Sequence, residues 1–442
     1  MWWWNFGIPA VAGALYLWSG LNRSHRRTRL WREALALCGV TEEESSRVWG
    51  LRAQLTARSY PLEVRITDAR GRGDRAEVAI DGPEGLFAVK LSRQHLKRRT
   101  HEIEVGHKEF DDIFLVNGPI RPVCARLDAT MRRQLIRVSA VCDPLEIGTG
   151  QLRVEISDEM LHHALPVLLD IGRQLAEPVD VEQRIARNAR QDPEAGVRLS
   201  NLLLLIQERR SDPETLRVLR GASSDPSPAV RVRAAIELGD EEILLELAEH
   251  SMDDASCAQA VAHLGGKLPF ELAKSILARS LRRGLFQTAR ACLEVLGQHR
   301  AAAVGILEKV MTEEKGELAA AAALALGTTG EAAAEPPLLQ ALQSEDSDLR
   351  EAAAAALGRV GSVAAVQPLK EAAERSWLDL TLRRAARQAI AEIQSPHRRL
   401  ARSAFARPDR NRKAFAGTLR GGSGGSGICF GRLSPRFRRR TA

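Results

Sequence analysis

The second half of this chain carries five Leu-Gly dipeptides at nearly even intervals. Their glycines are 26, 32, 30 and 31 residues apart, and the sequence around them is helical in character. A period of about 20–50 residues in helical sequence is typical of a solenoid, in which stacked helix pairs bury a core that no single pair can form. The spacing therefore predicts an α-solenoid with an extended binding surface. The dipeptides are Leu238-Gly239, Leu264-Gly265, Leu296-Gly297, Leu326-Gly327 and Leu357-Gly358.

Each repeat unit also carries signals for the start and the end of a helix. Asp192, Asp225 and Asp346 precede the first helix of their units, where a short acidic side chain can accept hydrogen bonds from first-turn amides. The glycine of the dipeptide is expected to end that helix, because glycine adopts a left-handed backbone without a Cβ clash. A second helix follows in each unit, as in Val363–Glu374. Each unit is thus predicted to be a helix pair.

The segments 225–239 and 346–358 resemble the HEAT repeat, in the short form found in phycobilin lyases. The likeness covers residues 185–396, although the Asp-Pro lead and the arginine are missing between 241 and 310. In that family, Asp and Arg side chains of successive repeats form a ladder that holds the stack in register. A structural or solvated role is expected for these arginines, rather than ligand binding. The resemblance implies a repeat-stacking set of Arg198, Asp225, Arg231, Asp346, Arg350 and Arg383.

The N-terminus contains no charged side chain in residues 1–22. Residues 2–21 are mostly apolar, and twenty residues at about 1.5 Å each span the roughly 30 Å hydrocarbon core of a bilayer. Tryptophans at one end and Tyr16 with Trp18 at the other are typical of interfacial anchors. Residues 1–22 are therefore predicted to be a single transmembrane anchor, followed by a basic juxtamembrane segment at 23–32.

The arginines of this juxtamembrane segment predict the orientation of the anchor. All positive side chains near the apolar run follow it, so the positive-inside rule places the N-terminus outside and the bulk of the chain in the cytoplasm, on the inner (cytoplasmic) membrane. A cleaved signal peptide would need positive charge before the apolar run, which favours the uncleaved anchor. A peripheral anchor stays open, because Pro9 weakens the helix. The arginines are Arg23, Arg26, Arg27, Arg29 and Arg32.

The charge of the chain, +8 in total, is segregated at its ends. Residues 397–442 contain thirteen Lys or Arg and a single acid, so the body between the two basic ends is net negative. Such a tail cannot bury enough apolar surface to fold alone and is predicted to be disordered. Its arginines and interleaved phenylalanines could bind RNA or anionic lipid. A solvated extension with no specific partner is the third possibility.

Residues 33–180 are predicted to form a small α+β module. Short apolar or β-branched runs separated by Gly and Pro turns indicate an antiparallel sheet, and Met160–Glu177 has the spacing of an amphipathic helix. The segment 106–118 is similar to a stretch of uncharacterised bacterial membrane-anchored proteins, a resemblance that implies no activity. The expected strands are 60–67, 75–81, 86–91, 110–116, 135–141 and 152–156.

The sequence contains no recognisable catalytic, cofactor-binding or metal-binding pattern. His101 and His107 lack the His-Glu-x-x-His spacing of a zinc site, and His162 and His163 would point about 100° apart on a helix. The six cysteines show no Cys-x-x-Cys, so reduced thiols are expected. We therefore expect no catalytic residue, cofactor or metal.

Three classes of function remain open. The first is a membrane-anchored, non-enzymatic scaffold that binds partner proteins on its solenoid, which the repeats and the missing catalytic pattern favour. The second is nucleic-acid association through the arginine-rich tail. The third is a lyase-type role on a protein-bound cofactor, which the likeness to phycobilin lyases implies. The low aromatic content, 4%, argues against a tetrapyrrole site.

Overall fold

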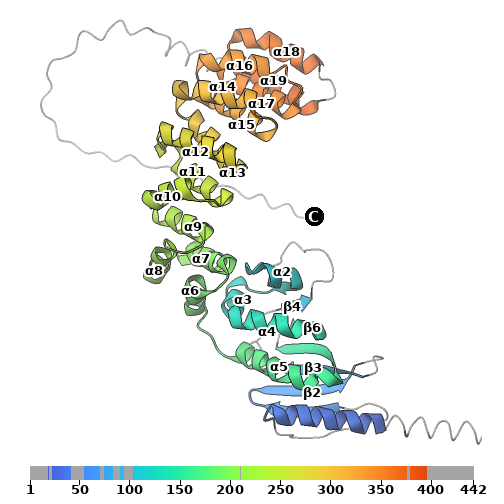
Figure 1. Ribbon diagram of the computed structural model, residues 1–442. Coiled ribbons are helices and arrows are strands. Elements are labelled where there is room, and N and C mark those ends of the chain that lie inside the picture. Colours follow the sequence, from blue (N-terminus) through green and yellow to red (C-terminus); the bar gives the residue numbers. More distant parts are fainter. Residues whose placement is uncertain are drawn as a thin grey trace, which may run out of the picture.

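The chain combines a sheet module near its N-terminus with a long stack of helices (Figure 1). The predicted architecture, mainly helical with a small sheet module before a solenoid, is confirmed at this level. No described helix is both long and apolar enough to cross a membrane. The predicted anchor, residues 1–22, lies outside the described residues apart from Trp18 and Asn22. The computed structural model describes residues 18, 22–40, 54–69, 74–82, 90–93 (backbone only), 103–148, 150–209, 211–375 and 379–395.

The module is built on a seven-stranded sheet with the order β1-β2-β3-β7-β6-β4-β5. Every neighbouring pair is antiparallel. In β2, Leu62, Val64 and Ile66 are buried while the residues between them are partly exposed, so one face of the sheet meets the core and the other meets solvent. The strands are β1 (Gln54–Ser59), β2 (Leu62–Asp68), β3 (Arg75–Asp81), β4 (Lys90–Arg93), β5 (Phe114–Asn117), β6 (Cys142–Gly148) and β7 (Gln151–Ser157).

Helices cover the buried face of this sheet (Figure 1). The helix α5 contacts β2 and β7, and it lies close because a Cβ at Gly172 would approach the Leu62 side chain to 3.0 Å. Its observed span agrees with the prediction to within one residue at each end. The module helices are α2 (Lys108–Ile113), α3 (Ile120–Arg126), α4 (Ala129–Ser139), the 3-10 turn η1 (Asp158–Met160) and α5 (Leu161–Ala176).

The structure corrects two of the predicted strands. The segment 135–141 belongs mostly to α4, which Asp128 caps by accepting hydrogen bonds from two first-turn amides. Leu135 and Val138 are buried three residues apart, a helical spacing that outweighs their β-branched neighbours. The segment 110–116 divides between α2 and β5. Two further strands, β1 and β6, were not predicted, and only the end of the predicted strand 86–91 falls in β4.

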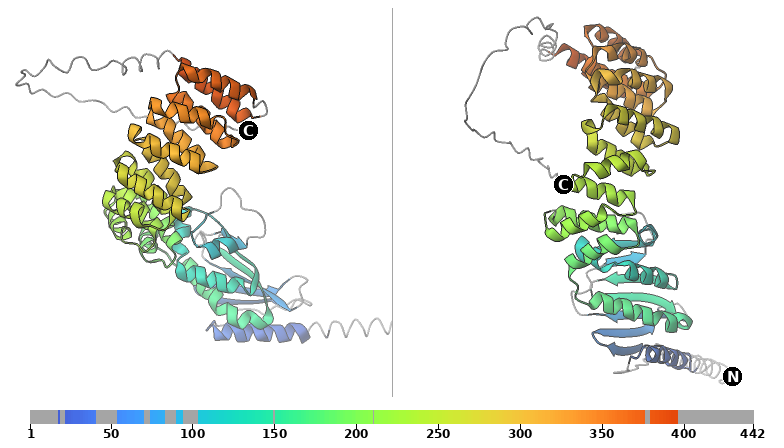
Figure 2. Two further views of the ribbon diagram at one scale, coloured as in Figure 1. Left: turned by 45° about the horizontal axis from the view of Figure 1, so that its top comes forward. Right: turned by 60° about the vertical axis from the view of Figure 1, so that its left-hand side comes forward.

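A helix over residues 22–37 packs on the module near β2 (Figure 2). Trp31 is fully buried and donates from Nε1 to Asp158 at 2.9 Å. Arg27 is 7% exposed and donates to the carboxylates of Asp158 and Asp68, and to the Arg75 carbonyl at 2.7 Å. The segment 23–32, predicted as a basic juxtamembrane segment, is therefore helical, and part of it lies in the core of the module.

From α6 onward the helices stack in chain order (Figure 1). Each first helix of a unit packs against the first helices before and after it and against the second helix that precedes it. This serial arrangement is the predicted solenoid. Its helices are α6 (Val181–Gln191), α7 (Ala195–Arg209), α8 (Pro213–Ala222), α9 (Pro228–Leu238), α10 (Glu241–His250), α11 (Asp254–Leu264), α12 (Phe270–Arg283), α13 (Phe286–Gly297), α14 (Val304–Glu313), α15 (Glu317–Thr329), α16 (Glu335–Ala341), α17 (Ser347–Val360), α18 (Val366–Arg375) and α19 (Leu380–Gln394).

The module and the first repeats share one hydrophobic core. One buried cluster runs from Trp31 to Ala234, and a second runs from Val232 to Ile393. The helix α9 contributes to both clusters and so links the core of the module and first repeats to the core of the later repeats. The first solenoid helix, α6, begins at Val181, within the interval 180–185 where the sequence places the boundary.

The buried carboxylate of Asp158 provides a direct test of how the 22–37 helix is held. Replacing it by alanine leaves the Arg27 guanidinium buried with one carboxylate partner fewer, and breaking such a pair costs about 3–5 kcal/mol. We expect Asp158→Ala to lower the free energy of unfolding by about 3 kcal/mol or more, measured by urea denaturation. Glu33→Ala is the control, because its pair with Arg29 is exposed, and it should change stability by less than about 0.5 kcal/mol. Equal effects of the two substitutions would show that the buried contacts with Asp158 do not hold the 22–37 helix in place.

Candidate functional site

Two of the five repeated glycines lie inside helices instead of ending them. Gly297 is the last residue of α13, Gly327 lies within α15, and Gly358 lies within α17. The expected helix-stop role holds at Gly239, which caps α9 with φ 70°. The expectation is wrong at Gly327 and Gly358, so another physical reason must place glycine there.

Close contact between successive first helices is that reason. A Cβ at Gly327 would lie 2.7 Å from the Ala356 Cα, and a Cβ at Gly358 would lie 3.1 Å from the Ala389 Cα. Both neighbours are backbone atoms, which cannot move aside as a flexible side chain can. Glycine therefore lets α15, α17 and α19 pack backbone against backbone, and the result is a tight row of first helices.

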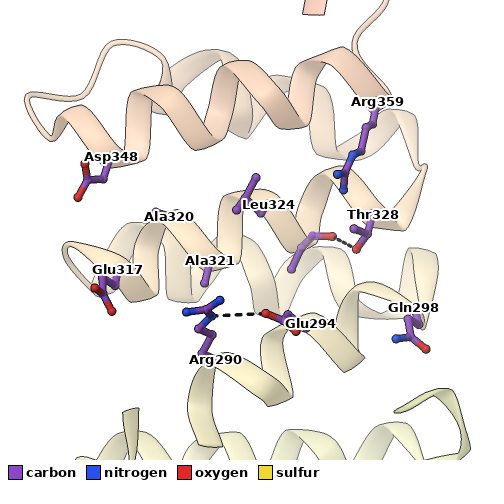
Figure 3. A pocket seen from close by; sticks show the side chains of 11 residues that line it. Arg290, Glu294, Gln298, Glu317, Ala320, Ala321, Leu324, Thr328, Asp348 and Arg359 are labelled. Atoms are coloured by element: carbon purple, nitrogen blue, oxygen red, sulfur yellow. Dashed lines mark hydrogen bonds and ion pairs between the residues drawn. The ribbon is translucent and has the colours of Figure 1, made fainter. Parts of the chain in front are cut away.

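The exposed side of this row is hollowed into a groove of about 580 Å³ (Figure 3). Its floor is apolar and comes from α15, where Ala320 and Ala321 are half-buried and Leu324 is 41% exposed. The alanines leave room above the helix that larger side chains would fill. We call this hollow, floored by Ala320, Ala321 and Leu324, the first-helix groove.

The rim of the first-helix groove is charged and differs between its two ends. Glu317 and Asp348 lie at one end, whereas Arg359 lies at the other (Figure 3). On the near wall, Arg290 pairs with Glu294 at 3.4 Å, but both side chains are exposed and such a pair contributes little. The groove therefore presents an apolar floor between an acidic end and a basic end.

Two further hollows extend the groove along the solenoid. One, of about 560 Å³, shares Arg290 and Glu317 with it and includes Phe286, which is 66% exposed. The other, of about 370 Å³, shares Arg359 and reaches Arg384 on α19. The hollowed surface thus runs from α13 to α19, along the row that the helical glycines create.

The predicted stacking residues of the early repeats lie together. Arg198 donates to both carboxylate oxygens of Asp225 at 2.7 Å, and both side chains are buried. This hydrogen bonding raises the pKa of the Arg198 guanidinium above its usual value. Arg231 donates to the backbone carbonyl of Asp225 at 3.2 Å. These three residues tie α7 to α9.

The predicted stacking residues of the late repeats form a second group. Asp346 caps α17 and also accepts from the Gly316 amide of the preceding unit at 3.1 Å. Arg350 reaches Asp379, which caps α19, at 3.4 Å. Hydrogen bonds to the Asp379 carboxylate, chiefly the one from the Leu382 amide, lower its pKa. Arg383 lies in the first turn of α19, and its amide donates to the Asp379 carbonyl.

The middle units, which lack the arginine, use a different contact. The Asp254 carboxylate accepts from the Gln287 and Thr288 amides of the next unit at 2.9 and 2.8 Å. The Thr288 hydroxyl donates to the same carboxylate at 2.7 Å. An acidic residue at the start of α11 thus bonds directly to α13, the first helix of the next unit, so the stack stays connected where the arginine is missing.

An ion pair that the sequence reasoning missed joins the module to the solenoid. Arg132 of α4 donates to Asp192 at 2.7 and 3.0 Å, and each side chain is 1% exposed. The carbonyl of Asp192 in turn accepts from Arg198 at 2.8 Å. Beside this pair, Gly106 and Gly196 touch so closely that a Cβ on either would meet the backbone of the other within 2.5 Å. Asp192 was noted only as a helix start, and no local signal marked Arg132.

His101 lies outside the described residues. Next to His107, Asp111 accepts from the Val105 and Gly106 amides, and burial raises the pKa of its carboxyl. His162 and His163 stack on each other on the exposed side of α5. Within the described part of the chain, no three His, Cys, Asp or Glu side chains are placed to hold a metal ion.

Comparison with known proteins connects the groove to a repeat family. Residues 304–391, which include α14 to α18 and most of the groove floor, match the family described as HEAT repeats. The resemblance seen at 346–358 is therefore confirmed over this stretch. No curated protein matches the chain.

Two solved structures are similar to parts of the chain. A crystal structure of an engineered protein aligns at 20% identity and a TM-score of 0.27, covering 52% of this chain and 70% of that one. Human deoxyhypusine hydroxylase in complex with glycerol aligns at 18% identity and a TM-score of 0.19, covering 48% and 95%. Alignments this distant indicate nothing about activity.

The glycine contacts predict opposite effects for two identical substitutions. Gly327→Ala places a methyl group against the backbone of α17, and such overpacking costs about 1–3 kcal/mol. Gly305→Ala, in α14, adds a methyl where no atom lies within 4 Å, and it should stabilise the helix by about 0.5–1 kcal/mol. Thermal and urea unfolding of both variants measure the difference. Stabilisation by both alanines would show that the first helices are not in backbone contact.

Proposed function

We propose that this protein is a membrane-anchored, non-enzymatic HEAT-repeat scaffold that binds a partner protein in the first-helix groove. The observation that carries the proposal is the apolar floor of Ala320, Ala321 and Leu324 inside a charged rim. An apolar centre surrounded by polar groups is the arrangement found in protein–protein interfaces. HEAT repeats form the groove, and stacked repeats offer the long surface that such binding uses.

The charges of the rim define the partner surface that would fit. An apolar side chain would cover Leu324, and it would gain about 25 cal/mol for each Å² of apolar area removed from water. A positive group would face Glu317 and Asp348, while a negative group would face Arg359. An amphipathic helix with charges of opposite sign at its two ends meets these requirements, since helices commonly bind grooves through one apolar face.

The membrane part of the proposal rests on the sequence. Residues 2–21 would cross the inner membrane with the N-terminus outside, and the solenoid would act in the cytoplasm. An amphipathic partner could then be cytoplasmic or could itself be attached to the membrane. The basic tail, residues 397–442, would add affinity for anionic lipid or RNA.

Two leucines with nearly equal exposure allow a matched test of the groove. Leu324 is 41% exposed on the groove floor, and Leu203 is 39% exposed on α7, outside the groove. Because both are already exposed, glutamate at either position should leave the fold intact. We expect Leu324→Glu to reduce cross-linked partner recovered from solubilised membranes about tenfold or more, which corresponds to about 1.4 kcal/mol.

Leu203→Glu is the control and should leave recovery unchanged. Quantitative mass spectrometry of the cross-linked material, normalised to the amount of bait, provides the readout. An identical set and amount of partners for wild type and Leu324→Glu would refute binding in the groove.

A further inference from the structure

The outward side of the 22–37 helix combines exposed leucines with arginines. Leu30 is 39% exposed and Leu37 is 72% exposed. They are seven residues apart, which is close to two helical turns, so they lie on the same side of the helix. Trp18 is also exposed, at 65%. Large apolar side chains exposed together on one side of a helix are typical of an interaction surface.

Arg23 and Arg26, seven and four residues before Leu30, are exposed on the same side as the two leucines. Arg29 and Arg32 are exposed further round the helix, and Glu33, the single acid of this helix, pairs with Arg29. Arg27 does not contribute, because it is buried against Asp158 and Asp68. We define the basic helix face as the exposed side chains of Arg23, Arg26, Leu30 and Leu37.

The basic helix face lies at one end of the molecule. The opposite end of the stack is formed by α18 and α19 (Figures 1 and 2). Burial raises the pKa of Cys38, which directly follows the helix, and the nearby positive charge of Arg173 opposes this rise. Arg173 also donates to Ser59, at the end of β1, at 2.9 Å. The C-terminal end of the helix therefore lies near the β1–β2 turn. Tyr60, in that turn, is 97% exposed and adds an aromatic side chain at this end.

We propose that the basic helix face lies flat on an anionic lipid surface, an inference that rests on the proposed membrane anchor and adds a second contact to it. Arginines would bind headgroup phosphates, and Leu30 and Leu37 would enter the boundary between headgroups and acyl chains. Amphipathic helices at membrane surfaces bind by this combination of charge and apolar area. The apolar segment 2–21, which directly precedes the helix, would hold this face at the bilayer.

The rigid attachment of the helix gives this contact a structural consequence. Trp31 is buried in the core of the module, and Arg27 bonds to two carboxylates there. The helix therefore cannot tilt independently of the sheet. A membrane against the basic helix face would place the first-helix groove away from the bilayer, on the far half of the stack (Figure 2).

Lipid explains this face better than nucleic acid does. Phosphate backbones would pair with the arginines, but they offer nothing apolar to cover Leu30 and Leu37. Single strands bind through aromatic stacking, whereas the large apolar side chains of the basic helix face, Leu30 and Leu37, are aliphatic. A lipid surface satisfies both the charged and the apolar side chains.

The test compares two positions at opposite ends of the full-length chain. Leu37 and Leu380 are each 72% exposed, and each is replaced by cysteine in a chain with Cys38→Ser and Cys429→Ser, then labelled with a fluorophore. The remaining cysteines are buried, and burial raises the pKa of Cys124 to about 11 and of Cys292 to about 12, so they should not react. Vesicles of phosphatidylcholine, with or without phosphatidylglycerol, carry a nitroxide on the headgroup as quencher.

We expect headgroup nitroxide to quench the label at position 37 at least about twofold more than the label at position 380 when phosphatidylglycerol is present. Arg23→Glu with Arg26→Glu should abolish this difference, since both side chains are exposed and their loss leaves the core unchanged. Equal quenching at the two positions would overturn the proposal. So would loss of quenching at position 37 on addition of single-stranded RNA, which would assign the face to nucleic acid.

Vesicle flotation of the same samples separates this proposal from the anchor. If the charge-reversed chain floats but position 37 is no longer quenched, both the anchor and the basic helix face are supported. If the charge-reversed chain does not float while the unaltered chain is quenched at position 37, the anchor is wrong and the face stands. Flotation of the unaltered chain without preferential quenching at position 37 supports the anchor and overturns the face.

Discussion

A buried ion pair between the sheet module and the first repeat holds the two architectures together. Arg132 and Asp192 are each 1% exposed, so separating them would leave an uncompensated charge in the core, at a cost of about 3–5 kcal/mol. The Asp192 backbone bonds to Arg198, and Arg198 bonds to Asp225. A solenoid needs a cap on its first repeat, because that repeat has no earlier neighbour to cover its apolar face. The module fills this role.

The sequence predicted the serial order of the helices but not their contacts. Period, capping aspartates and apolar spacing are local signals, and they place a helix pair in each unit. Arg132 pairs with a residue sixty positions away, a relation that no local pattern marks. The helix-stop interpretation of the repeated glycines is right at Gly239 and wrong at Gly327, because the same residue type serves as a cap in one place and allows a close contact in the other. Only the neighbouring backbone distinguishes the two.

The candidate groove was beyond sequence reasoning for a related reason. An alanine run such as the one before Leu324 predicts a helix and close packing, and both occur. Whether small side chains face a neighbour or the solvent depends on how far each helix is rotated against the next. In α15, small residues face both ways. Gly327 contacts α17, while Ala320 and Ala321 remain at the surface. The packing that stabilises the stack thereby produces the hollow above it.

The module caps the solenoid through one shared core, and hydrogen exchange of the Arg132→Met variant tests this arrangement most directly. Methionine keeps much of the apolar stem but leaves Asp192 without its partner. If the core is shared, backbone amides of α4, α7 and α9 should lose protection together, while amides of α15 and α17 keep theirs. Loss of protection confined to α4, with α7 and α9 exchanging as in the unaltered protein, would contradict the account.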